Sequence, residues 1–223
     1  MYDLHTHSLL SDGELLPSEL ARRFEAKGFK AIAITDHVDA SNIEAVVPAL
    51  VKFCKTWPKN RIKVIPGIEL THIPLEHFKP LIKYARKNGI KVIVAHGETT
   101  TEPVIKGTNR QALMLGIDIL AHPGLISKED VLLAKKKGVF LELTCRKGHR
   151  ITNSHVARLA NKIGAKLIIN SDSHCPKDIV KFDQHIKYVL KAGLNQSHLN
   201  KILKDTSSFI GKITFNYNKI GKT

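Results

Sequence analysis

The sequence predicts a single α/β domain whose parallel strands close into a barrel. Apolar segments of four to seven residues alternate with segments of helical periodicity, as expected for βα units around a parallel sheet. Several apolar segments are rich in Val and Ile without alternation, which is typical of strands covered on both faces. Six of the segments lead directly into a metal-type ligand. Because all strand ends meet at one face only in a closed barrel, the ligands favour a barrel over an open doubly wound sheet.

The apolar segments define the expected strands, about seven in number. They lie near residues 2–5, 31–36, 63–69, 91–96, 117–122, 139–144 and 166–172. A helix is expected from Pro17 to Gly28, since proline suits a first helical turn and glycine ends a helix. Similar helices are expected at residues 43–55, 75–88, 128–137 and 154–163. The tail at residues 209–223 has no place in this scheme.

Size and composition favour one domain spanning residues 1–223. No segment approaches the ~20 consecutive apolar residues of a membrane span, and the N-terminus carries His and Asp where a signal peptide would be apolar. We therefore expect a cytoplasmic protein with no membrane partner. The three cysteines, Cys54, Cys145 and Cys175, are odd in number and far apart, which fits reduced thiols, and a CxxC zinc knuckle is not expected.

The net charge of +15 has two interpretations. It could attract a polyanion or a phosphorylated substrate, or it could be a solvated surface rich in lysine. Much of the excess is scattered over helical segments, as at Lys135, Lys136 and Lys137, which favours the solvated surface.

The ligand-type residues begin with His5 and His7, at the end of the first expected strand. Side chains two apart in a strand point to the same side, so both rings can bind one cation. The later strands end in further ligand types, namely His37, Glu69, His96, His122, Asp172 and His174. A barrel would gather all of them at one rim.

The order of these motifs resembles the PHP (polymerase and histidinol phosphatase) family. The motifs are Asp3-Leu-His-Thr-His7, Ser11-Asp-Gly13, Thr35-Asp-His37, Gly67-Ile-Glu69, Ala95-His96, Ala121-His-Pro123 and Ser171-Asp-Ser-His174. The resemblance implies a distorted (β/α)7 TIM-like barrel that holds two or three divalent metals at its C-terminal rim. It assigns His5, His7, Glu69 and Asp172 to the first metal, Glu69, His96 and His122 to the second, and Asp12, His37 and His174 to the third. Asp12 stands where many relatives have histidine.

Imidazole and carboxylate ligands without thiolates suit Zn, Mn or Fe and a catalytic site with open positions. Metals about 4 Å apart can lower the pKa of a water and orient a phosphate. The candidate catalytic residues are Glu69, Asp172, His174 and Arg146. Arg146 and Arg150 follow the strand at 139–144 and are candidates for binding the phosphate, although a solvated basic loop is the competing interpretation.

Weaker expectations concern the remaining polar residues. Glu98, Thr99, Asn109 and Arg110 could line a substrate pocket or could be ordinary loop residues, while Asp3 and Asp36 could orient imidazoles or cap turns. Cys145 is expected to pack as a small apolar residue, and Cys175 is unassigned. Five histidines lie away from strand ends and are expected at the surface or in packing: His72, His77, His155, His185 and His198.

These features predict a metal-dependent phosphoesterase that hydrolyses a small phosphate monoester by a metal-activated hydroxide. The resemblance suggests histidinol phosphate or a nucleotide-type phosphate. One alternative is a metal-dependent exonuclease acting on nucleic-acid ends, which the charge of +15 would suit. Another is a non-catalytic nucleic-acid-binding barrel, which has no physical need for nine converging ligands. The sequence leaves the oligomeric state open.

Overall fold

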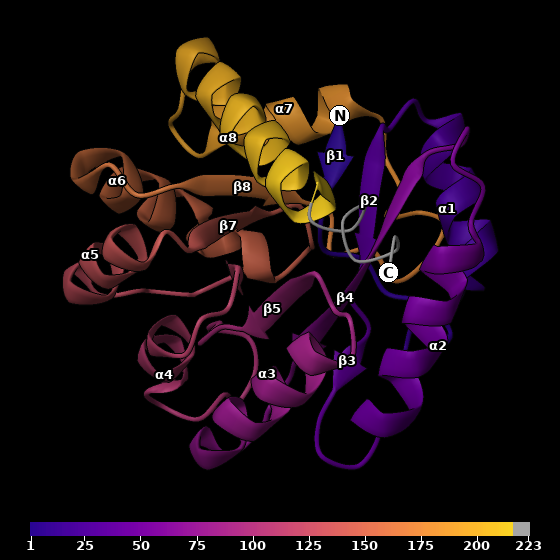
Figure 1. Cartoon of the computed structure of the whole chain (residues 1–223). Coiled ribbons are helices and arrows are strands. Elements are labelled where there is room, and N and C mark those ends of the chain that lie inside the picture. The colour runs from indigo at the N-terminus through magenta and orange to yellow at the C-terminus, as the bar shows by residue number, and fades with distance from the viewer. Residues whose placement is uncertain (216–223) are drawn as a thin grey trace.

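The computed structural model describes residues 1–215, which form one α/β domain with a nearly closed barrel (Figure 1). Its sheet is parallel throughout, in the order β1-β2-β4-β5-β6-β7-β8, and β3 also pairs with β4. The strands are β1 Tyr2–Asp3, β2 Ala31–Ile34, β3 His37–Val38, β4 Lys63–Leu70, β5 Val92–His96, β6 Ile119–Ala121, β7 Phe140–Thr144 and β8 Leu167–Asn170. The barrel prediction is confirmed.

The strand predicted at residues 31–36 is present as two pieces. Ile34 pairs with Pro66 and His37 with Glu69, so β2 and β3 keep one register along β4 and share one position in the barrel. Between them the Thr35 N–H donates to the carbonyl of Thr6. The seven predicted strands therefore correspond to seven barrel positions, and their predicted ends differ from the observed ends by at most two residues.

The barrel closes between β1 and β8 at the C-terminal ends of these strands. The Asp172 N–H donates to the His5 carbonyl at 3.0 Å, and the His7 N–H donates to the Ser173 carbonyl at 2.9 Å. Parallel pairing is reduced here to a single bridge between Thr6 and Ser173. The closing contact is thus made by the same short segments that carry four predicted ligands.

All five predicted helices are present, each within three residues of its expected ends. They are α1 Pro17–Ala26, α2 Ile43–Thr56, α3 Phe78–Lys87 after the 3-10 turn η1 Leu75–His77, α5 Lys128–Lys137, and α6 Asn153–Ile163 after the 3-10 turn η2 His149–Thr152. Three helices were not predicted: α4 Thr108–Met114, α7 Phe182–Lys191 and α8 Gln196–Phe215. None of the described helices is long and apolar enough to span a membrane.

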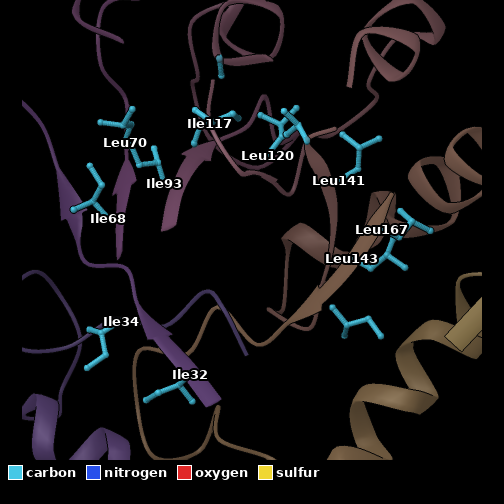
Figure 2. Close-up of a cluster of buried hydrophobic side chains, with 14 of the residues drawn as sticks. Ile32, Ile34, Ile68, Leu70, Ile93, Ile117, Leu120, Leu141, Leu143 and Leu167 are labelled. Carbon is cyan, nitrogen blue, oxygen red and sulfur yellow. The ribbon is translucent and has the colours of Figure 1, made fainter. Parts of the chain in front are cut away.

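The apolar core has two layers because strand residues alternate between the two faces of the barrel wall. The outer layer lies between the strands and the surrounding helices, where Ile32, Leu70 and Leu141 pack (Figure 2). The inner layer fills the barrel interior and includes Leu4, Ala33, Ile65, Val94 and Phe140, among others. Above it, the inward positions nearer the C-terminal strand ends become polar, which creates the site.

Helix α8 packs against the inner layer, next to β1 and β8. Ile210 is buried in that layer, and Phe209 packs on Phe140 with ring centroids 5.4 Å apart. The first part of the unplaced tail, residues 209–215, is therefore the end of α8, and residues 216–223 lie outside the described part of the chain.

Candidate metal centre

Glu69 lies at the centre of the predicted ligands, fully buried on the inner face of β4. Its Oε2 atom is 3.2 Å from His5 Nε2 and 3.5 Å from His7 Nε2. The same oxygen is 2.9 Å from His37 Nδ1, while Oε1 is 3.8 Å from His122 Nε2. The two oxygens therefore face different imidazoles, as a carboxylate that bridges two metals would require.

Asp172 completes the group around His5 and His7. Its Oδ1 atom lies 3.7 Å from His5 Nε2 and 3.3 Å from His7 Nε2, and its Oδ2 lies 3.6 Å from His122 Nε2. Asp172 has φ of 54°, a left-handed conformation that costs energy for a non-glycine residue. This turn at the end of β8 directs the carboxylate into the cluster.

A second group contains the ligands predicted for the third metal. The Nε2 atoms of His37 and His174 are 3.4 Å apart, and Asp12 lies within 3.4 Å of both. The ring of His7 stacks on each of these histidines, with centroids 4.1 Å away. Asp12 has 56% of its side chain exposed, so this group lies at the open side of the site.

His96 lies apart from the group to which the resemblance assigns it. Its ring is 4.4 Å from that of His122, but its Nε2 atom faces Glu102 at 3.0 Å. Its donor atom clusters with those of His72 and Glu102, whereas the His122 donor clusters with those of His5 and Glu69.

The buried donor atoms fit a divalent metal. His5 Nε2, both ring nitrogens of His7 and both oxygens of Glu69 are buried without a hydrogen-bond partner. In four rings Nδ1 faces an oxygen, which fixes the ring and leaves Nε2 for a ligand. These oxygens belong to Glu142 for His5, Thr71 for His37, the Gly97 carbonyl for His96 and the Asp172 carbonyl for His174. Buried polar atoms without partners are costly, so converging lone pairs indicate a cation site.

The electrostatics of the cluster point the same way. Burial would raise the pKa of Glu69, but His5 and His37 hold it well below its ordinary range, so the carboxylate stays charged. Burial and the neighbouring ring of His37 hold the pKa of His7 well below its usual value. Burial raises the pKa of Asp172 to about 6. Glu69 is therefore a buried anion that nearby positive charge stabilises, and a divalent cation bound here would supply such charge.

Arg146 lies beside this cluster and Arg150 does not. Arg146 Nη1 donates to the Asp172 carbonyl at 3.1 Å and lies 2.7 Å from His174 Nδ1, and a third of its side chain is exposed. Arg150 donates instead to the Tyr188 hydroxyl at 2.9 Å and lies over that ring. The contacts of Arg150 are therefore structural, which argues against its expected part in binding the phosphate.

A cavity of about 530 Å³ opens onto the cluster and is lined by six of the nine predicted ligands. Its wall also contains Arg146, His149 and Glu102. A slightly larger cavity of about 600 Å³ lies at the opposite, N-terminal ends of β2 and β4. Among residues 1–215, its lining contains five Lys and one Arg and no His or carboxylate, so these residues offer no metal-binding donor set.

The model of the PHP domain family matches residues 3–215. The chain belongs to the PHP family. The resemblance carried by the sequence motifs is confirmed. An uncharacterized protein of Methanocaldococcus jannaschii is 44% identical over 207 residues, which are 91% of this chain and 94% of the relative. A probable phosphatase of a Thermoanaerobacter species is 27% identical over 223 residues, with 87% of each chain covered.

Two solved structures share the PHP barrel. Histidinol phosphate phosphatase of Lactococcus lactis, complexed with zinc, L-histidinol and phosphate, matches with a TM-score of 0.61 and 17% identity, over 87% of this chain and 94% of that one. A chain of an archaeal ribonuclease P bound to mature tRNA matches with a TM-score of 0.72 and 16% identity, over 96% and 92%. At these identities the likeness is one of fold.

Several polar residues of this PHP chain have structural roles. Asp3 accepts the His5 and Ser171 N–H groups, and Asp36 accepts the Ser8 N–H, so both cap turns and contact no imidazole through their carboxylates. The predicted pocket residues lie outside the cavity lining. The side chains of Glu98 and Asn109 each accept a hydrogen bond from the backbone N–H of the other residue. Arg110 forms an ion pair with Asp130, and the Thr99 hydroxyl contacts His149. Cys145 is buried in the outer core, as expected.

Three further residues of the site were not predicted from the sequence. Glu142 is fully buried on the inner face of β7 and accepts from His5 Nδ1 at 2.8 Å. The sequence could have indicated Glu142, because a Glu in the middle of an apolar strand is expected to be buried and to need a partner. His149 is buried, and its ring stacks on the ring of His122 with centroids 4.3 Å apart. The ring centroids of His72 and His96 are 4.8 Å apart. Placing His72 at the surface was therefore incomplete, whereas His185 packs between Phe29 and Phe182 as expected.

Proposed function

We propose that this chain is a metal-dependent phosphoesterase that hydrolyses a small phosphate monoester. The observation that carries the proposal is the convergence of buried, unpartnered His and Glu donors beneath an open cavity. Such a donor set is costly for a folded protein unless a cation is bound, and a structural site would be closed rather than open to a cavity.

We assign the metal-binding role to the nine residues predicted from the sequence: His5, His7, Asp12, His37, Glu69, His96, His122, Asp172 and His174. Bound divalent metals would lower the pKa of a water for attack and polarise the phosphate oxygens. Glu142 holds the His5 ring so that Nε2 faces Glu69 and Asp172. Arg146 lies at the wall of the cavity, where its remaining N–H groups would bind a phosphate oxygen and its contact with His174 would restrict that ring.

The size of the cavity supports a small substrate. About 530 Å³ is within the range of sites for small molecules and accommodates a phosphate monoester of metabolite size. The Lactococcus lactis neighbour binds L-histidinol and phosphate. We propose a substrate of the same chemical kind, either histidinol phosphate or a nucleotide-type phosphate.

Nucleic acid is the second candidate substrate. The net charge of +15 and the fold shared with a chain of ribonuclease P favour it. The concentration of cations around the second cavity argues against cleavage, because that cavity opens at the N-terminal strand ends while the ligands lie at the C-terminal ends. A polyanion held there would bind at the end of the barrel opposite the metal centre.

The test is hydrolysis by purified protein that is first stripped with a chelator and then loaded with Mn²⁺ or Zn²⁺. The panel contains histidinol phosphate, nucleoside monophosphates, other phosphate monoesters and short oligonucleotides. We expect metal-dependent release of phosphate from at least one monoester, with His7→Ala as the inactive control. Shortening of oligonucleotides without any monoester hydrolysis would replace the proposal with the exonuclease.

A further inference from the structure

One carboxylate outside the nine predicted ligands contacts three imidazoles. Glu102 lies on the loop between β5 and α4, and its Oε2 is 3.0 Å from both His72 Nε2 and His96 Nε2. Its Oε1 is 3.2 Å from His149 Nε2. These contacts bring together segments after β4, β5 and β7 at the mouth of the cavity.

The backbone at His72 supports a functional role. Among residues 1–215, the non-glycine residues with positive φ are His72 at 51°, His122 at 26° and Asp172 at 54°. Such conformations are strained for residues other than glycine and are retained mainly where a site requires them. His122 and Asp172 are predicted ligands, and the same conformation turns His72 toward His96, although 39% of its side chain is exposed.

The donor set and its support match a metal site. One ligand atom each from His72, His96 and Glu102 lies within 4.8 Å of the others. Two imidazoles and one carboxylate form a set that binds Zn, Mn or Fe with positions left open. The His96 Nδ1 faces the Gly97 carbonyl at 3.2 Å, and Glu102 Oε1 is held by His149, whose Nδ1 bonds the Thr99 hydroxyl at 2.7 Å. Metal ligands are oriented by such outer contacts.

We propose that His72, His96 and Glu102 bind a divalent metal at the cavity mouth, with His149 positioning Glu102. In this arrangement His96 binds the metal together with the loop residues His72 and Glu102. The open coordination positions face the cavity that contains Arg146. The inference rests on the proposed function only in taking the centre as one that is loaded with metal.

The test measures metal content and affinity, and it does not depend on hydrolysis. Chelator-treated protein is loaded with Zn²⁺ or Mn²⁺, freed of excess metal, and analysed by elemental analysis and titration calorimetry. The variants are Glu102→Gln and His72→Ala, and the matched controls are Glu76→Gln and His77→Ala, which change exposed residues outside the cavity. Glu102 and His72 are both more than a third exposed, so the variants should fold, which circular dichroism can check.

We expect each site variant to bind one metal ion fewer per chain, or to bind it at least tenfold more weakly, with wild-type content in both controls. Cobalt-loaded wild type should show a visible absorption band component that Glu102→Gln lacks. Wild-type stoichiometry and affinity in both site variants would overturn the inference and leave an ordinary ion-pair cluster. Metal content is measured independently of hydrolysis, so a protein that hydrolyses no monoester can still lose a metal in these variants. The failure of this inference can therefore be distinguished from the failure of the proposed function.

Discussion

At the scale of single residues, the two oxygens of Glu69 connect otherwise separate groups of imidazoles. Oε2 faces His5, His7 and His37, while Oε1 faces His122. Each of these imidazoles faces one oxygen of Glu69, whereas Glu69 faces all four imidazoles. The loss of Glu69 should therefore disturb more than one metal.

We expect Glu69→Gln to remain folded, since the amide has nearly the shape of the carboxylate. The variant should bind at least one metal ion fewer than wild type and should have little activity. Elemental analysis after loading with metal checks this outcome, with Glu76→Gln as the control for an exposed position. Full metal content in Glu69→Gln would rule out the bridging role.

Arg146 is the second residue whose role can be tested separately. Arg146→Ala should lower kcat/KM for a phosphate monoester by roughly 10- to 150-fold, because a charge-assisted hydrogen bond contributes about 1.5–3 kcal/mol. Metal content should not fall. Lys147→Ala, which removes an exposed cation from the same loop, is the matched control. Kinetics equal to those of wild type would show that Arg146 has only a structural role.

At the scale of secondary structure, most of the candidate ligands lie at or just beyond the end of a strand, and Asp12 lies on the loop between β1 and α1. Close packing of the loops is part of this arrangement. A Cβ on Gly97 would lie 2.3 Å from the Ala121 carbonyl oxygen, so glycine lets the loops that follow β5 and β6 meet beside His96 and His122. Helix α7 packs on the other side of the barrel wall through His185, which is 1% exposed.

His185 should make the protein sensitive to acid. Burial lowers its pKa to about 4, against about 6.5 in an unfolded chain. Between these values the unfolded chain binds the proton more readily, so stability is complete above pH ~6.5 and is lost as the pH falls toward 4. This residue should cost on the order of 3 kcal/mol of unfolding free energy over that interval.

Urea unfolding of wild type and His185→Leu at pH 7 and pH 4.5 checks this prediction. Leucine is of similar size but does not titrate, so the variant should lose less unfolding free energy than wild type on acidification. Because the metal centre also titrates, the comparison is the difference between the two proteins in the same buffer. Equal losses would show that His185 does not contribute.

At the scale of the whole molecule, the two ends of the barrel differ in chemistry. The C-terminal strand ends carry the His, Asp and Glu cluster, and the N-terminal ends carry a cavity lined by cations that include Lys30, Lys55, Lys59 and Lys63. Part of the +15 charge is therefore concentrated away from the candidate active site rather than only scattered, which refines the interpretation of the charge as a solvated surface.

We expect oligonucleotides to bind weakly, without sequence preference and with a steep dependence on salt. Binding through six or more phosphates would weaken by ~10³-fold or more between 50 and 200 mM salt, whereas hydrolysis of a monoester held mainly by metals should change little. The double variant Lys55→Ala/Lys59→Ala should reduce oligonucleotide binding and leave monoester hydrolysis at the wild-type rate. Submicromolar binding at physiological salt with metal-dependent shortening of the strand would favour the exonuclease.

The sequence by itself determined the βα alternation, the seven strand positions and eight of the nine candidate ligands, because each depends on local order along the chain. The ninth ligand, Asp12, came from the resemblance to the PHP family. A strand end is recognisable where an apolar segment stops, and side chains two apart necessarily share a side. His5 and His7 could therefore be paired from their spacing alone. The sequence patterns did not predict α4, α7 and α8, which bury apolar residues against the barrel.

Only the tertiary structure decided which ligand meets which partner. His5 and Glu142 are 137 residues apart, and Glu102 meets His72 and His149 from different loops. Such contacts depend on how neighbouring strands and their loops align in three dimensions, and periodicity along one segment carries no information about that alignment. For the same reason the side chain of Arg150 could not be distinguished from that of Arg146 until the fold turned one toward Tyr188 and the other toward Asp172.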